Sequence, residues 1–345
     1  MSLITEYTNY SAQKALELLA IDSPSGFTAK AAEWVKKEFE ALGCSAVITN
    51  KGAVLITVGG EGDGLILASH TDTLGAMVAE VKGNGRLRIV NIGGLKACNT
   101  ETEIVRVYTR DGRIYDGTIQ LKNASAHVNN ALGSTERTWD SVEVVLDEDV
   151  KCAADTYALG IDNGDFVCVE PRSVITKSGY IKSRYLDDKL SVGILLGLVK
   201  YIRDNNIALK RKLYMLVTVY EEVGHGGAAN IPADATEMIS VDMGCVGDGL
   251  KCTEKMVSIC AKDSVGPYDY SVTDRLVKAA QKEGAAYAID IYPSYSSDVD
   301  VTLKAGNDLR HGCVGAGVYA SHGYERSHLE GVENTLKVLK GYMEI

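Results

Sequence analysis

Leu65-Ile66-Leu67-Ala68-Ser69-His70-Thr71-Asp72 is the stretch that decides the predicted fold. Its first five residues are typical of a buried β-strand, and its last three are polar. Before this stretch the chain alternates between helical and strand patterns, and after it the pattern changes for about a hundred residues. We therefore expect one folding unit to be interrupted by another at this point.

The segments on either side of the interruption predict an α/β domain. Upstream, helical spacing over 11–43 is followed by short apolar runs at 46–49 and 53–58. Downstream, helical patterns at 190–205, 272–283 and 331–343 alternate with strand patterns at 213–220 and 239–243. Such alternation predicts a mixed or parallel sheet sandwiched by helices, built from residues 1–72 and 173–345.

The interrupting segment, residues 73–172, predicts a small all-β domain that resembles a barrel. It contains short alternating runs (MVAEV, RLRIV, IVRVYT, VEVVLD and FVCVE) separated by Asn-Gly and Asp-Gly pairs. A spacing of about ten residues between such runs, with few helical stretches, is typical of a meandering β domain.

Composition limits the classes of partner and compartment. The 345 residues carry 36 Lys and Arg against 46 Asp and Glu, a net charge of −10, which disfavours nucleic acid as a partner. No apolar run reaches the length of about 18 residues that a membrane span needs, and the first residues lack a signal-peptide pattern. The eight cysteines include no C-x-x-C pair. We expect a cytoplasmic protein with reduced thiols and no membrane contact.

Ionisable residues follow the predicted strands where each strand ends, and in such sheets ligands bind beyond the carboxyl ends of the strands. Two further polar segments precede the helix at 190–205 and follow the apolar run at 313–318. Carboxylates and imidazoles without thiolates suit zinc, cobalt or manganese. The residues of this pattern are His70, Asp72, Asp187, Asp188, Glu221, Glu222, Asp242 and His322.

Each of these residues also has a purely structural interpretation. A strand-end histidine is often only a satisfied polar residue, the pair Glu221-Glu222 could be solvated, and Asp187-Asp188 could cap the next helix. Both Glu221 and Glu222 reach one site only if the chain bends there. For the last imidazole, His328 competes with His322.

Taken together, the number and types of these residues favour a catalytic metal site over purely structural roles. Two divalent ions about 3.5–4 Å apart need roughly five protein ligands with one carboxylate shared, and a further carboxylate must move the proton of the attacking water. Glu221 is then left over for the proton. The five ligands would be His70, Asp187, Glu222, Asp242 and His322.

Five motifs in order, HTDTLGAMV, RYLDDKLSVG, VTVYEEVGHGGA, SVDMG and ASHGYERSHLEGVENT, resemble metallopeptidase family 42 over nearly the whole chain, including the β insert. The resemblance implies an α/β domain with an inserted β domain that mediates dimerisation, and often a tetrahedral dodecamer. It also implies two divalent ions per subunit, zinc first and cobalt or manganese as alternatives.

The resemblance also assigns roles. His70 and Asp242 would bind one ion, Glu222 and His322 the other, and Asp187 would bridge them. As for the remaining two residues, Glu221 would be the general base and acid, and Asp72 would orient a ligand or the base.

We therefore expect a metal-dependent aminopeptidase that removes N-terminal residues from peptides. Three alternatives remain at this point. The same centre could cleave small N-acyl substrates as an amidohydrolase, two of the carboxylates could serve a glycosidase, or the chain could bind metal without catalysis.

Overall fold

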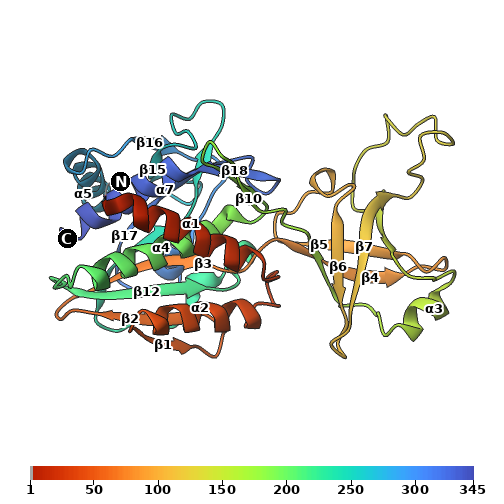
Figure 1. Cartoon of the computed structure of the whole chain (residues 1–345), viewed down its shortest axis with the longest axis horizontal. Helices are drawn as coiled ribbons and strands as arrows, with labels where there is room; N and C mark the ends of the chain where they lie inside the picture. Colours follow the sequence, from red (N-terminus) through yellow and green to blue (C-terminus); the bar gives the residue numbers. More distant parts are fainter. Residues whose placement is uncertain (1–2) are drawn as a thin grey trace. The chain divides into compact units, whose positions relative to one another are not determined.

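The computed structural model describes residues 3–345 and divides the chain into two compact units (Figure 1). The first unit runs up to Asp72 and resumes at Arg172, and the second is Thr73–Pro171. Residues 1 and 2, where the predicted catalytic domain begins, lie outside the described residues. The roles of the two units, catalysis and dimerisation, stay predictions.

The first unit is built on a 12-stranded mixed sheet. Its main path runs β1-β2-β12-β3-β13-β17-β18-β11-β10; off this path, β14 and β15 pair with β17, and β16 pairs with β15. The strands are β1 (Ser45–Ile48), β2 (Val54–Gly59), β3 (Gly64–His70), β10 (Val174–Ile175), β11 (Tyr180–Ser183), β12 (Lys212–Thr218), β13 (Ala235–Val241), β14 (Gly244–Val246), β15 (Val257–Lys262), β16 (Tyr287–Ile291), β17 (Arg310–Tyr319) and β18 (Glu325–His328).

Helices pack on this sheet. The combination of sheet and helices is the α/β architecture that the sequence predicts. The helices are α1 (Leu3–Leu19), α2 (Ala29–Ala41), α4 (Leu186–Asp204), α5 (Tyr270–Lys282), α6 (Asp298–Lys304) and α7 (Leu329–Tyr342), with two 3₁₀ turns, η2 (Glu221–Val223) and η3 (Gly226–Ala228). Every residue of β3 is buried, as in a strand covered on both faces. Helix α4 packs against β3, and Val299 of α6 joins the core cluster that holds Ile66 and Ala68. The predicted α/β fold is confirmed.

The centre of the sheet is parallel, and this places the ends of its strands together. β12 and β13 flank β3 in parallel, and β17 runs parallel to β13. Thr218 pairs with His70, so β12 and β3 end at the same level. Residues that follow these strands therefore leave the sheet at one edge.

The second unit is a closed barrel, which confirms the predicted barrel-like insert. Its order is β4-β5-β8-β7-β6-β9. The elements are β4 (Gly75–Val81), β5 (Leu87–Ile92), η1 (Ala97–Asn99), β6 (Ile104–Tyr108), β7 (Ile114–Leu121), β8 (Val142–Leu146), α3 (Ala153–Ala158) and β9 (Phe166–Val169). Alternate residues, such as Val105 and Val107 of β6, are fully buried, as expected for a barrel interior.

Two further features concern the cysteines and the hydrophobicity of the helices. All eight cysteines are free thiols. Among the residues that the structure describes, none of the helices combines the length and the hydrophobicity that crossing a membrane requires.

Candidate active site

Three neighbouring strands deliver the site residues to the same edge of the sheet. His70 is the last residue of β3, Glu221 and Glu222 lie in η2 just after β12, and Asp242 follows β13. The chain bends sharply around η2, because Tyr220 has a φ of 70° and Gly224 a φ of 81°. This is the bend that Glu221 and Glu222 need in order to approach one site.

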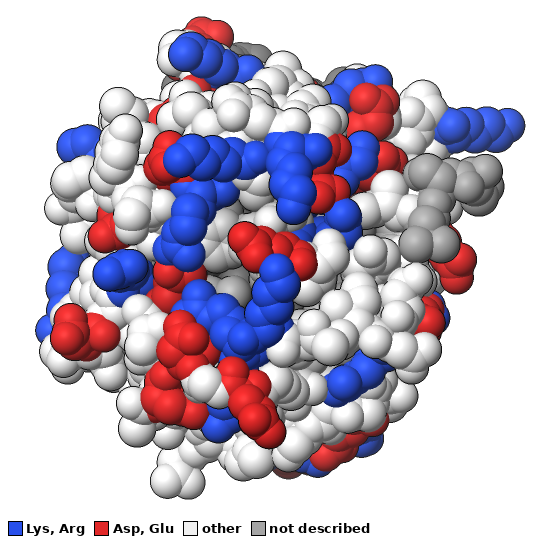
Figure 2. Space-filling view, turned by 90° about the vertical axis from the view of Figure 1, so that its left-hand side faces the viewer, with Lys and Arg blue, Asp and Glu red and all other residues white. Residues whose placement is uncertain are grey.

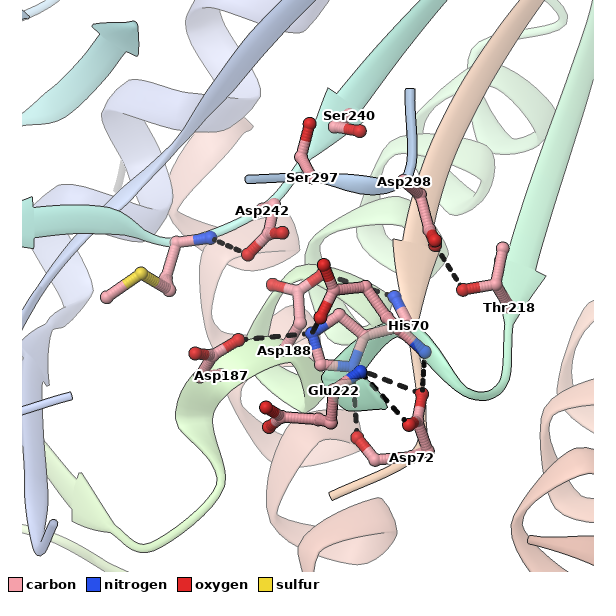
Figure 3. A network of polar contacts seen from close by, with 12 residues as sticks. His70, Asp72, Asp187, Asp188, Thr218, Glu222, Ser240, Asp242, Ser297 and Asp298 are labelled. Carbon is pink, nitrogen blue, oxygen red and sulfur yellow. Dashed lines mark hydrogen bonds and ion pairs between the residues drawn. The ribbon is translucent and has the colours of Figure 1, made fainter. Parts of the chain in front are cut away.

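His70 lies at the centre of the cluster (Figure 3). Its Nδ1 is 2.9 Å from the carbonyl oxygen of Asp72, which leaves Nε2 to face the carboxylates. Nε2 is 3.1 Å from Oδ1 of Asp187 and 3.6 Å from Oε2 of Glu221. The side chain is 1% exposed, so these contacts are shielded from water.

Two groups of candidate ligands share this imidazole. One contains His70, Asp187 and Glu222, and the other contains His70, Asp188 and Asp242; within each group the ligand atoms all lie within 4.8 Å of one another. Figure 3 shows these side chains gathered around His70. Nε2 of His70 can bind only one ion, but together the two groups bring four carboxylates around this imidazole, which supplies oxygen ligands for a second ion.

Asp187 and Asp188 do not cap helix α4. The N-cap position is Tyr185, with a φ of 66°, and both aspartates have non-helical backbone angles. The peptide bond between them is cis. Asp188, which the sequence analysis noted without a role, accepts the backbone N–H of His70 at Oδ2, at 3.3 Å.

The structure separates the two competing imidazoles. Nε2 of His322 is 3.6 Å from Oδ2 of Asp187 and 3.6 Å from Oε2 of Glu222. His328 instead caps α7, where its Nδ1 accepts the backbone N–H of Glu330 and its Nε2 lies 2.8 Å from the carbonyl oxygen of Ser178. The geometry therefore favours His322 as the second imidazole of the cluster.

Asp72 lies behind the cluster and binds backbone. It accepts the N–H of Glu221 at Oδ1 (3.1 Å) and the N–H of Glu222 at Oδ2 (3.3 Å). The hydroxyl of Ser25 donates to the same Oδ2 at 2.5 Å. These bonds fix the position of η2 relative to His70.

Burial and mutual repulsion raise most of the carboxyl pKa values at this site. Burial raises the pKa of Glu221 well above its ordinary value, and the charge of Asp242 adds to the shift. Burial likewise raises the pKa of Glu222, and the charge of Asp187 adds to that shift. The pKa of Asp242 rises to about 7 for the same reasons. For Asp187, hydrogen bonds from His322 and His70 outweigh burial and lower the pKa. The cluster thus holds more negative charge than its imidazoles can balance.

Divalent cations fit this donor set. Oxygen and imidazole nitrogen are the ligands that zinc, cobalt and manganese accept. Oδ1 of Asp188 is buried and has no hydrogen-bond partner among the described residues, an arrangement that is costly unless a ligand meets it. A cation would also supply the positive charge that the carboxylates lack.

Two buried carboxylates that were not among the predicted site residues hold the site together. Glu325 accepts the backbone N–H of Asp187 at 3.1 Å and that of His322 at 3.0 Å, and burial raises its pKa to about 8. Asp298 accepts the hydroxyl of Thr218 and the N–H of Gly227. Both residues lie within sequence motifs that carry or flank the proposed site, and this position could have marked them as candidates. The spacing of the motifs cannot show which groups these carboxylates bind.

A cavity of about 410 Å³ opens beside the cluster. It is lined by Asp187, Glu221, Glu222, Gly224, Asp242, Ser264, Ser294, Tyr295, Ser296 and His322. The candidate ligands therefore form one wall of a space that a substrate could enter, and a tyrosine and three serines form another.

A second cavity, of about 510 Å³, lies at the opposite edge, where the parallel strands begin. Its three arginines, Arg211, Arg275 and Arg310, are matched by three carboxylates of the same lining. Figure 2 likewise shows one face on which Lys and Arg side chains lie next to Asp and Glu side chains. At this cavity the charge of the arginines is therefore balanced by carboxylates.

The chain resembles known aminopeptidases in sequence and in fold. The chain is 42% identical over 330 residues, 95% of each chain, to a Bacillus subtilis (strain 168) protein named "Putative aminopeptidase YhfE". Its fold matches an aminopeptidase from the archaeon Desulfurococcus kamchatkensis with a TM-score of 0.87 at 20% identity, over 98% of this chain and 95% of that one. It also matches the Pyrococcus horikoshii TET1 peptidase with a TM-score of 0.83 at 20% identity, over 96% and 98%. The M42 glutamyl aminopeptidase model matches residues 52–338, so this chain is a peptide hydrolase that belongs to peptidase family M42.

Proposed function

We propose that the chain is an aminopeptidase that works with two divalent metal ions bound at the His70 cluster. The observation that carries this proposal is the gathering of buried carboxylates around His70, with Oε2 of Glu221 3.6 Å from Nε2 of the same imidazole. The family and the names of the relatives support the peptidase class.

The proposed ligands are His70, Asp187, Glu222, Asp242 and His322, with Asp187 between the two imidazoles. Zinc is our first choice, and cobalt and manganese suit the same donors. When bound, the ions would polarise the scissile carbonyl and lower the pKa of water.

Glu221 is the proposed general base and acid. Its carboxylate lines the cavity and is not needed to complete the five ligands, so it is available to take a proton from the attacking water and pass it to the leaving amine.

Asp72 and Glu325 are proposed as positioning residues. Asp72 binds the backbone on both residues of η2, and Glu325 joins the backbone of Asp187 to that of His322. Neither carboxylate is part of the cavity wall, so each acts through the residues that it holds.

Replacing Glu221 with Gln tests the proposal. The variant keeps the size of the side chain but cannot accept the proton, so we expect kcat to fall by about 10²–10⁴-fold with the bound metal unchanged. Elemental analysis and aminoacyl-4-nitroanilide hydrolysis measure the two quantities. Glu40→Gln on α2, an exposed residue paired with Lys36, is the matched control. Full activity in Glu221→Gln would show that another group moves the proton.

The same assays separate the remaining activities. An aminopeptidase needs a free α-amine, so a preference for N-acetyl amino acids over aminoacyl-nitroanilides would point to an amidohydrolase. A chelator should abolish peptide hydrolysis, and added zinc, cobalt or manganese should restore it. Activity that survives complete removal of metal would favour a two-carboxylate mechanism such as that of a glycosidase.

We also propose a cytoplasmic homo-oligomer in which the barrel unit contributes to dimerisation. The eight free thiols suit a reducing compartment. The TET1 peptidase of Pyrococcus horikoshii can assemble into a tetrahedron or a large octahedral shell, which supports a closed assembly here. Light scattering on the full chain measures the mass, and a monomer at micromolar concentration would contradict this proposal.

A further inference from the structure

The part of the cavity wall that is not made of proposed ligands carries no charge. Beyond the ligand cluster and Glu221, the lining consists of Gly224, Ser264, Ser294, Tyr295 and Ser296. No Lys or Arg belongs to the described lining of this cavity. The side chain of a peptide's first residue, held at the cluster, must therefore lie against neutral groups.

Two lysines of neighbouring segments, Lys51 and Lys262, do not supply the missing charge. Lys51 donates to the carbonyl oxygens of His225 and Gly226. Lys262 donates to the carbonyl oxygen of Asp263 at 2.7 Å. Both ammonium groups are thus bound to backbone, and neither residue lines the cavity.

Carboxylates are equally unavailable for a basic side chain. Those in the lining are Asp187, Glu221, Glu222 and Asp242, which the proposed function already uses for ions and proton transfer. Asp263, beneath the wall, is fully buried and accepts the hydroxyl of Tyr268 at 2.7 Å. A lysine or arginine side chain would therefore find no free partner.

The neutral wall is fixed by its own hydrogen bonds. Both the N–H and the hydroxyl of Ser264 donate to the carbonyl oxygen of Tyr295, at 3.1 and 2.5 Å, which joins the loop after β15 to the loop after β16. The hydroxyl of Tyr295 donates to the carbonyl oxygen of Met243 at 3.1 Å. Oδ1 of Asp263 accepts the N–H groups of Val265 and Gly266. A charged substrate side chain could not easily recruit a partner by moving this wall.

We propose that this enzyme removes uncharged N-terminal residues and discriminates against glutamate, aspartate, lysine and arginine. The inference rests on the proposed aminopeptidase function and differs from the glutamyl specificity that the description of the family names. A charged side chain gains no ion pair at this wall, whereas an alanine, leucine or methionine side chain needs none.

The test compares kcat/KM for aminoacyl-4-nitroanilides on the metal-loaded full chain. We expect the values for alanine, leucine and methionine to exceed those for glutamate and lysine by at least about tenfold. Equal or higher values for glutamate or lysine would overturn the inference but not the proposed function. Failure to hydrolyse any member of the panel would instead overturn the proposed function.

A designed variant tests the wall directly. Ser296→Arg places a cation in the cavity and should raise the ratio of glutamate to leucine kcat/KM by about tenfold or more. Ser45→Arg, on the exposed side of edge strand β1 and outside the lining, is the matched control and should leave the ratio unchanged. An unchanged ratio in a folded, metal-loaded Ser296→Arg enzyme would show that this wall does not contact the substrate side chain. The wild-type panel decides the inference even where the variant fails to fold.

Discussion

Lys51 offers a way to weaken the proposed site without touching a ligand. Its ammonium group donates to the carbonyl oxygens of His225 and, at 3.0 Å, of Gly226, in the loop that follows Glu221 and Glu222. In the same loop, the N–H of Gly227 donates to Asp298 at 2.6 Å. The loop is therefore held between a cation and an anion from distant parts of the chain.

The expected effect of Lys51→Met on stability and on kcat follows from the hydrogen bonds that the substitution removes. A hydrogen bond that involves a charged group contributes about 1.5–3 kcal/mol, and water can replace part of it here because Lys51 is only half-buried. We expect a loss of about 1–3 kcal/mol, which is smaller than the 5–15 kcal/mol that stabilises a typical domain. The protein should fold, but the loop should move relative to His70. A displacement of about 1 Å in a catalytic group costs roughly 10²-fold in rate, so kcat should fall about 10–100-fold.

The assay is steady-state hydrolysis of a leucine 4-nitroanilide by the metal-loaded enzyme, with metal content and Tm measured on the same sample. KM should change little because Lys51 does not line the cavity. Lys51→Arg keeps a donor and should recover part of kcat, and Lys36→Met, on α2 and outside the cavity lining, is the control. A Lys51→Met enzyme with wild-type kcat would refute the argument that this ammonium group positions the loop.

Two further predictions concern stability. Glu237 is 3% exposed and forms ion pairs with Arg211 and Arg275. Glu237→Ala leaves these cations without their partner, so it should lower the free energy of unfolding by about 2–4 kcal/mol, measured by urea titration. A change below about 0.5 kcal/mol would contradict this prediction. Burial, together with Asp263, raises the pKa of Asp300 to about 6. The folded state then binds this proton more tightly than the unfolded state, so the contribution of Asp300 to stability falls as pH rises from about 4 to 6. The Tm of Asp300→Asn relative to wild type should therefore increase between pH 5 and pH 8, and a constant or decreasing difference would contradict the assignment.

The sequence predicts the parts of the site that follow from strand order. His70, Glu222 and Asp242 lie at the ends of parallel neighbours, and the rule that such ends share an edge is independent of sequence distance. The period of the buried strands also predicted the sheet core and the barrel, because burial on one or both faces leaves a pattern in the chain itself.

Elements that depend on distant partners could not be predicted in this way. Helix α6 has the sequence DVDVTLK, in which Asp298 and Asp300 are buried. No local rule predicts burial of these carboxylates, since the partners of Asp298, Thr218 and Gly227, lie more than 70 residues away. The choice between His322 and His328 as the second imidazole likewise depends on residues that are distant in the sequence. Ser178, which contacts His328, is 150 residues distant in the sequence.

Backbone conformation links these long-range contacts to the proposed chemistry. Three loops that carry site residues contain a non-glycine residue in the left-handed region: Tyr185 before Asp187, Tyr220 before Glu221, and His322 itself, with φ values of 66°, 70° and 62°. Such residues cost of order 1 kcal/mol each and persist only where the surrounding structure holds them. Here the surroundings are buried carboxylates bonded to backbone: Asp72 holds the N–H groups of η2, and Glu325 holds those of Asp187 and His322. The acidic residues around the cluster thus divide into those that would face the ions and those that keep the unfavourable loop conformations in place. It follows that replacing a carboxylate of the second kind should move the ligands even though it removes none of them.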